Sequence, residues 1–270
     1  MDVTAVVEEV RRRGGVVRRS SLPRHAAVLA VEQGRLVVPR AGLVAVPDAP
    51  RPLLVAASVG GVLSCASAAQ VHGAELLEPP GQPHVTVPRG RHVRRRPGVV
   101  LHVRDVVCEG MVTSLSRTAA DCARCLPERD AVVVLDAVLR RGVAVEEIRQ
   151  HLWGRGCGPA REALRRADGR SGSSGESVAR LALEDAGLDV VPQVRIPGVG
   201  WVDLLVEGRV VVEIDGFAYH SDAKQFAADR RRDARLAELG YRVLRFTWLD
   251  VVRDPAAVVA TVQRVLALSA

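Results

Sequence analysis

Residues 201–220, with the sequence WVDLLVEGRVVVEIDGFAYH, constrain the fold of this chain more than any other stretch. Two short runs rich in valine and leucine, 201–206 and 209–215, flank the dipeptide at 207–208, which is Glu-Gly. Short apolar runs separated by a glycine-containing pair are typical of two strands joined by a tight turn. The stretch therefore predicts a β-hairpin whose strands are partly buried.

Three carboxylates interrupt this hydrophobic hairpin. Asp203 lies in the first run, whereas Glu213 and Asp215 end the second. Side chains two residues apart on a strand share a face, so Glu213 and Asp215 project together, with Asp203 near both on an antiparallel neighbour. Grouped carboxylates resist burial unless a cation lies between them, and their oxygens suit Mg²⁺ or Mn²⁺. A single acid would be expected to face water, but three acids followed by His220 favour a metal site.

Length and composition limit the class of protein. The chain has 270 residues, of which 48% are hydrophobic, enough for two or three folded domains. No apolar run is long enough to span a bilayer, and the acidic N-terminus is unlike a signal peptide, so we expect a cytoplasmic protein with no membrane partner. Five cysteines, an odd number, fit a reducing compartment.

The positive charge of the chain is carried almost entirely by arginine. The net charge is +7, and Lys224 is the one lysine. Clustered arginines indicate a polyanionic partner, DNA foremost, and Arg230, Arg231 and Arg232 on an expected long helix are candidates to hold its backbone. Two plainer explanations stay open: codon usage in a GC-rich genome, and a solvated helix face.

The first 50 residues have the pattern of a winged-helix DNA-binding domain. Three short helices are expected before a two-stranded wing, at 4–13, from 22 onward, and at 26–32. The third helix would enter the major groove with Arg24 and His25 near its start, and the wing would bring Arg40 to the phosphates. A small helical domain with no role in DNA binding is the alternative, because such patterns specify function loosely.

Residues 51–167 are expected to form a central α+β domain. A helix ends at Gly73, and the strand-like segments PHVTVP and GVVLHVRD are joined by RGRHVRRRPG, which we predict to be an arginine-dense hairpin tip. This tip is either a phosphate contact or merely exposed. Cys122 and Cys125 form a CxxC pair on a later helix, but a zinc site needs four ligands and no second pair or nearby histidine pair follows. We therefore expect core packing and assign no metal there.

The glycine- and serine-rich stretch 168–175 has the composition of a linker and precedes the last expected domain, 176–270. The elements expected from there have the order α-β-β-β-α-β, which is also the core order of the PD-(D/E)XK nuclease fold. The whole chain is thus predicted to be α/β, in the sense of an α+β multidomain protein with a restriction-endonuclease-like C-terminal domain.

The last hundred residues resemble the DUF559 family of endonuclease-like domains and the very short patch repair endonucleases. The motifs that carry this resemblance are Glu176, WVD, VVEIDGFAYH and DRRRDARLAELGYRVLRF. It implies that Asp203 is the principal metal ligand, that Glu213 is the second acid, and that Glu176 binds metal or water. It also implies that His220 acts as general acid or base in Mg²⁺-dependent hydrolysis of DNA. Glu176 also lies in the first turn of a helix, where favouring the positive helix end explains it equally well.

Residues 1–160 are similar to antitoxins of the AbiEi type, through GGVLSCASAAQVHG, HVTVPRGR and the helix around Arg117. That resemblance implies a DNA-binding regulator with a toxin partner. One departure from the nuclease motif leaves the catalytic set incomplete: Asp215 stands where the wider superfamily has a lysine. The patch repair endonucleases also lack this lysine, so its absence does not by itself imply an inactive enzyme. His220, Lys224 or a second metal ion held partly by Asp215 are the candidates to replace the lysine. The two hypotheses are thus a Mg²⁺-dependent DNA endonuclease, with RNA as a weaker alternative substrate, and an antitoxin-type regulator with an inactive nuclease fold.

Overall fold

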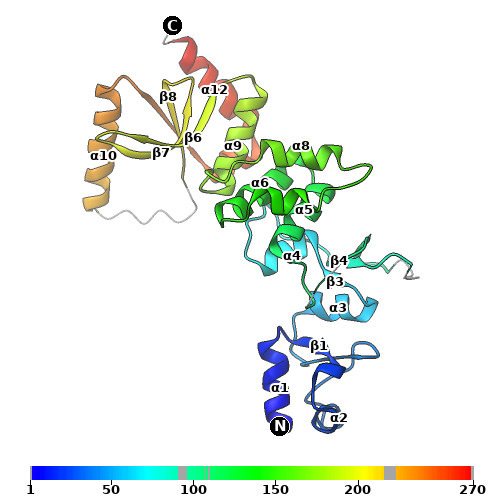
Figure 1. Ribbon diagram of the computed structural model, residues 1–270. Coiled ribbons are helices and arrows are strands. Elements are labelled where there is room, and N and C mark those ends of the chain that lie inside the picture. Colours follow the sequence, from blue (N-terminus) through cyan, green and yellow to red (C-terminus); the bar gives the residue numbers. More distant parts are fainter. Residues whose placement is uncertain (1, 91–95, 107, 109, 216–222, 269–270) are drawn as a thin grey trace. The chain divides into compact units, whose positions relative to one another are not determined.

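The computed structural model describes residues 2–90, 96–106, 108, 110–215 and 223–268, and its contacts divide the chain into two compact units (Figure 1). The first unit comprises residues 1–74, 78–125 and 146–153, and the second comprises 75–77, 126–145 and 154–270. Both units contain helices and sheet, so the expectation of a mixed α/β protein is confirmed. The domain bounds given by the sequence stay a prediction.

The N-terminal part of the first unit contains two α-helices and a small sheet. Its elements are α1 (Val3–Arg12), β1 (Val16–Arg18), a 3-10 turn (Arg19–Ser21), α2 (Arg24–Glu32) and β2 (Leu43–Ala45). The two helices expected from residue 22 and at 26–32 are one helix, α2, because Leu22 before the proline is extended and Pro23 is the N-cap. Before the 3-10 turn, Val16 and Val17 form a strand that pairs antiparallel with Ala45 and Val44. β-branched residues directly after a glycine pair favour an extended chain over a helix. The winged-helix assignment stays a prediction.

The remainder of the first unit builds a three-stranded sheet covered by helices. Its elements are α3 (Arg51–Val59), β3 (Val62–Leu63), α4 (Cys65–Val71), β4 (His84–Val87), β5 (Val100–Val103), α5 (Leu115–Cys125) and α7 (Val145–Arg149). The strand order is β3-β4-β5, with β4 and β5 parallel. The expected hairpin between them is therefore wrong, because parallel neighbours need a long crossover instead of a tight turn. Residues 91–95 of the predicted arginine-dense tip lie outside the described residues.

The second unit contains the expected α-β-β-β-α-β order. Its elements are α6 (Glu128–Arg140), α8 (Gly158–Arg166), α9 (Ser174–Asp185), β6 (Val190–Ile196), β7 (Gly200–Val206), β8 (Val210–Asp215), α10 (Ala223–Glu238), β9 (Arg242–Thr247), α11 (Trp248–Arg253) and α12 (Pro255–Ala267). The sheet has the order β6-β7-β8-β9, antiparallel except for the parallel pair β8–β9. The helix α11 was not expected from the sequence.

Both faces of this four-stranded sheet are covered by helices. Val210 and Val212 of β8 pack in a cluster with α9 and α12, whereas Val211 packs with Leu236 of α10 on the opposite face. Figure 1 shows α10 on one side of the sheet and α9 and α12 on the other. A strand covered on both faces needs an unbroken apolar run, and β8 has one until Glu213. Glu213, the first acid of this strand, is thus also its last buried residue.

The glycine- and serine-rich segment before α9 is held against α6. The backbone N–H of Asp168 donates to Asp136 Oδ1 at 2.7 Å, and the carbonyl of the buried Ser171 accepts from Arg140. Arg180 of α9 pairs with Asp136 at 2.9 Å, with both side chains almost fully buried. These contacts place the start of α9, and with it Glu176, against the core of the second unit.

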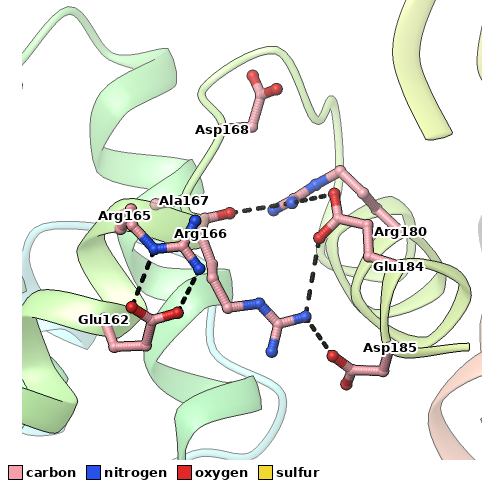
Figure 2. A pocket seen from close by; sticks show the side chains of 8 residues that line it. All are labelled: Glu162, Arg165, Arg166, Ala167, Asp168, Arg180, Glu184 and Asp185. Carbon is pink, nitrogen blue, oxygen red and sulfur yellow. Dashed lines mark hydrogen bonds and ion pairs between the residues drawn. The ribbon is translucent and has the colours of Figure 1, made fainter. Parts of the chain in front are cut away.

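A surface ion-pair network joins α8 and α9 beside this segment (Figure 2). Arg166 pairs with Glu128, with Glu184 at 3.7 Å and with Asp185 at 2.6 Å, and Arg165 pairs with Glu162 within α8. The network lines a shallow depression, and its guanidinium groups are matched by carboxylates. We assign it a structural role. Among the described residues, no helix has the length and apolar content to cross a bilayer.

Candidate active site

Glu176 and Asp203 are brought together by a glutamine that the sequence analysis did not single out. Glu176 lies in the first turn of α9 and is 6% exposed. Its Oε2 accepts hydrogen bonds from the backbone N–H of Gly172 at 2.7 Å and from Gln193 Nε2 at 2.9 Å. The same Gln193 nitrogen lies 3.4 Å from Asp203 Oδ1, and the other Asp203 oxygen accepts from the backbone N–H of Ile214 at 2.9 Å. Gln193 therefore connects the helix acid to the strand acid.

The backbone around this constellation has two special features. Gln193 has a φ of 49° within β6, a left-handed conformation that non-glycine residues rarely adopt and that surrounding contacts must stabilise. A Cβ on Gly172 would lie 2.9 Å from Glu176 Oε1 and 3.2 Å from Gln193 Nε2. Glycine at 172 thus allows the backbone to approach the carboxylate closely.

The environment of Asp203 opposes its ionisation. Burial raises the pKa of the Asp203 carboxyl above its ordinary value, and the neighbouring charge of Glu176 raises it further. The Ile214 N–H, the more distant charge of Arg232 and the Gln193 amide lower this pKa, but do not cancel the rise. Within the part of the chain that the structure describes, neither Asp203 nor Glu176 has an ion-pair partner. The site therefore holds two carboxylates without a matching positive charge from those residues.

Glu213 has different partners. It is 8% exposed on β8, and its carboxylate pairs with Arg232 Nη1 of α10 at 2.5 Å and with Arg245 Nε of β9 at 3.3 Å. Arg245 also pairs with Asp233, which contributes most to raising the pKa of that guanidinium. Two cations already compensate the charge of Glu213. The contacts of Glu213 thus favour ion pairs with these arginines over the expected carboxylate cluster with Asp203. Its role as a metal ligand stays a prediction.

The other predicted catalytic residues lie further along the same strand and loop. Asp215 is half-buried at the end of β8, opposite Thr247 of β9 in the parallel register. His220 lies outside the described residues, as does the side chain of Lys224. Their proposed roles in proton transfer and charge stabilisation therefore stay predictions.

The predicted DNA contacts occupy exposed and half-buried positions. Arg230 and Arg231 are exposed on α10, whereas Arg232 forms an ion pair with Glu213 and donates a hydrogen bond to the carbonyl of Trp201. In the first unit, Arg24 and His25 are exposed in the first turn of α2.

Arg40 is half-buried and lines a cavity of about 910 Å³ together with Arg13 and Arg18. A basic cavity of this kind is suited to an anionic group such as a phosphate. The involvement of Arg40 in DNA binding stays a prediction.

Gln193 was missed because a neutral side chain in a strand gives no pattern in one sequence. The signal was the register: Pro192 pairs with Leu204 and Val194 with Val202, so Gln193 lies opposite Asp203. That relationship is defined by strand pairing and becomes visible only in the fold.

Parts of this chain are similar to known proteins. A restriction-endonuclease-like family model, REase_MTES_1575, matches residues 176–266, which span the elements from α9 to α12. The uncharacterized protein MT2308 of Mycobacterium tuberculosis (strain CDC 1551 / Oshkosh) is 32% identical over 195 residues, covering 64% of this chain and 70% of that protein. This chain belongs to the same family. The uncharacterized protein Rv2248 of Mycobacterium tuberculosis (strain ATCC 25618 / H37Rv), another member, has the same identity and coverage.

Two solved structures are similar at low identity. The catalytic domain of the homing endonuclease I-Bth0305I is 21% identical, covers 33% of this chain and 90% of its own, and has a TM-score of 0.29. The RV2827C protein from Mycobacterium tuberculosis is 18% identical, covers 67% of this chain and 80% of its own, and has a TM-score of 0.35. Neither similarity is close enough to define function. The family model shows that this member of the family contains an endonuclease-like domain at 176–266.

Proposed function

We propose that residues 176–266 form a metal-dependent endonuclease that hydrolyses phosphodiester bonds in DNA. The observation that carries this proposal is the connection of Glu176 to Asp203 through Gln193, within a domain that a restriction-endonuclease-like family model matches. Three oxygen-bearing side chains from a helix and two strands converge there. Such a group has no evident structural purpose, since burial and the charge of Glu176 raise the pKa of Asp203 and so oppose its ionisation.

The donor set fits a hard divalent cation such as Mg²⁺ or Mn²⁺. Asp203 and Glu176 offer carboxylate oxygens, and their uncompensated charge among the described residues is what a cation would balance. Asp203 and Glu176 would hold the ion, and Glu213 would join them only by exchanging its ion pair with Arg232. When bound, the ion supplies neutralisation of the phosphate charge and a lower pKa for the attacking water.

The chain's own residues supply the remaining requirements. Arg232 and Arg245 place two positive charges beside Glu213 on the same strand edge. They are candidates to stabilise the developing charge where the superfamily uses the lysine that Asp215 replaces. His220, by its intrinsic pKa, is the proposed partner that protonates the leaving oxygen.

Delivery to DNA is assigned to both units. Exposed Arg230 and Arg231 would contact the phosphate backbone near the site, and Arg24, His25 and Arg40 would do so in the first unit. Such contacts add affinity without sequence information.

Plasmid nicking by the full-length protein tests the proposal. We expect Mg²⁺-dependent conversion of supercoiled to open-circular DNA, reduced about 100-fold or more by Asp203→Asn, since this change removes a ligand charge. Asp189→Asn is the matched control, because Asp189 is exposed in the same domain away from Gln193. Nicking by Asp203→Asn at the rate of the unchanged protein would overturn the assignment of the site.

A second function is an antitoxin-type DNA-binding regulator of the AbiEi kind, whose nuclease fold is inactive and which binds a toxin partner. The observation in its favour is that Glu213 forms ion pairs with two arginines, while Asp215 occupies the position of the superfamily's lysine. This function predicts DNA binding without cleavage of duplex, mismatched, branched or single-stranded substrates in Mg²⁺ or Mn²⁺. Any metal-dependent cleavage that Asp203→Asn abolishes would exclude it.

A further inference from the structure

Four side chains with nitrogen or sulfur donors converge in the first unit. They are Cys65, His84, His102 and Cys125, and one donor atom of each lies within 4.8 Å of a donor atom of every other. Cys65 is buried, and the other three are half-buried. Nothing in the nuclease site involves these residues, which belong to the other unit.

Four separate elements position the cluster. Cys65 begins α4, His84 begins β4, His102 lies in β5 and Cys125 ends α5. The parallel register pairs Thr86 with His102, so His84, two residues earlier on β4, projects from the same face of the sheet as His102. The two cysteines approach that face from the start of one helix and the end of another.

Local interactions fix the orientation of this group. Cys65 has a φ of 50°, an unusual value for a non-glycine residue, which the surrounding fold must impose. Thr86 Oγ1 donates a buried hydrogen bond to Ser64 Oγ at 2.8 Å, which connects the residue before Cys65 to the strand that carries His84. The backbone N–H of His84 donates to Ser67 Oγ of α4 at 2.9 Å. Supporting contacts of this kind orient ligands around an ion.

Three distances among His84, His102 and Cys125 are close to edges of a tetrahedral site, and the sulfur of Cys65 lies within 4.8 Å of each of these donor atoms. His84 Nδ1 and His102 Nε2 are 3.3 Å apart, and Cys125 Sγ lies 3.8 Å and 3.9 Å from these nitrogens. Zinc bonds of about 2.0–2.1 Å to nitrogen and 2.3 Å to sulfur give tetrahedral edges of about 3.3–3.4 Å between nitrogens and about 3.6 Å between sulfur and nitrogen. The observed edges are met after small adjustments of the cysteine side chain.

We propose that Cys65, His84, His102 and Cys125 bind one Zn²⁺ ion. Two sulfur and two imidazole ligands in tetrahedral arrangement suit zinc, whereas a two-iron cluster would spread its ligands over two metal atoms. Four protein ligands fill the coordination shell, so the site is structural: it joins α4, β4, β5 and α5 into one body. It is chemically separate from the proposed nuclease site, whose donors are all oxygens.

The separation of the ligands along the chain explains why the motif escapes notice. Between successive ligands lie 18, 17 and 22 other residues, unlike the closely spaced pairs of ligands that mark zinc fingers. Cys122, which forms the visible CxxC with Cys125, is fully buried and is not one of the four. Core packing is thus confirmed for Cys122, whereas Cys125 has a different environment.

Metal analysis of the full-length protein tests the inference. Protein purified with zinc and freed of loosely bound metal by gel filtration is expected to contain one Zn²⁺ per chain. After removal by a chelator, titration with Co²⁺ is expected to give visible bands of tetrahedral cobalt together with thiolate charge-transfer absorption, saturating at one equivalent. Less than about one-tenth equivalent of zinc with no thiolate–cobalt band would overturn the proposal, as would octahedral cobalt spectra.

Substitutions identify the ligands. Three variants, Cys65→Ser, Cys125→Ser and His102→Ala, are each expected to retain less than one zinc per chain. Their thiolate–cobalt charge-transfer band is expected to be weaker or absent. Cys122→Ala and Cys108→Ser are matched thiol controls in the same unit and are expected to retain one zinc. Retention of full zinc by Cys65→Ser and Cys125→Ser would overturn the assignment.

A thiol measurement covers variants that fold poorly. In the unchanged protein, Cys65 and Cys125 are expected to resist a thiol reagent while zinc is bound and to react faster, by about tenfold or more, after chelation. Equal reactivity before and after chelation would contradict zinc ligation without any variant. This readout is independent of nuclease activity, so failure of either proposal leaves the other standing.

Discussion

The side-chain amide of Gln193 donates a hydrogen bond to the carboxylate of Glu176 at 2.9 Å. The contact joins β6 to α9 and brings the same nitrogen to 3.4 Å from Asp203. A neutral donor between two acids reduces their repulsion without supplying a compensating charge. We infer that Gln193 keeps the two carboxylates in place for a cation.

Gln193→Glu is expected to destabilise the protein at pH 7 in the absence of metal. The change is nearly isosteric but places a third carboxylate beside Glu176 and Asp203, and like charges at this separation disfavour the fold by about 1 kcal/mol or more. Added Mg²⁺ should recover more stability in this variant than in the unchanged protein. Thermal unfolding with and without Mg²⁺ measures both effects, and an unchanged melting temperature would contradict the geometry.

Asp203→Asn is expected to stabilise the metal-free protein at neutral pH while removing activity. Because the folded pKa of Asp203 is raised, its protonated form is favoured in the fold. The contribution of this group to stability is fully present below its unfolded pKa of about 3.9 and is lost as pH rises through the folded pKa.

The asparagine keeps an oxygen to accept from Ile214 N–H. The melting temperature of Asp203→Asn should therefore exceed that of the unchanged protein at pH 7, and the two should converge as pH falls toward 4. A variant that is less stable at pH 7 without metal would refute this explanation.

Gly172→Ala is expected to disturb Glu176 specifically. Its Cβ would lie 2.9 Å from Glu176 Oε1, so the carboxylate or the turn must move, which should cost about 1–3 kcal/mol and weaken the Mg²⁺-dependent rise in melting temperature. Gly158→Ala is the matched control, since a Cβ there meets nothing within 4 Å. Equal behaviour of the two variants would show that the backbone approach at Gly172 is unimportant.

Asp136→Asn tests the buried ion pair that holds the start of α9. It retains an acceptor for the Asp168 N–H and leaves Arg180 its ion pair with Glu184 at 2.9 Å, but removes the charge of its buried partner, which should cost about 1–3 kcal/mol. The exposed pair of Arg165 and Glu162 is the contrast, and Arg165→Gln should cause no measurable change. Urea unfolding of both variants gives the comparison, and similar midpoints would contradict the structural importance of the pair.

The sequence by itself determined the order of elements in the C-terminal domain. Alternating and continuous apolar runs, with glycines between them, predicted the hairpin and the α-β-β-β-α-β order, because these patterns depend on local periodicity. It also placed Asp203 and Glu213 on neighbouring strands, and β7 and β8 are antiparallel neighbours. Local spacing, however, predicted a hairpin for β4 and β5 where the strands are parallel.

The tertiary structure alone decided which side chains share an environment. Gln193 meets Glu176, Glu213 meets two arginines, and Cys125 meets Cys65, His84 and His102 instead of acting with its CxxC neighbour. These side-chain contacts depend on strand register, on whether strands pair parallel or antiparallel, and on which helix ends face a sheet. Such relationships join residues far apart in the chain, and the local pattern of amino acids around each residue carries no information about them.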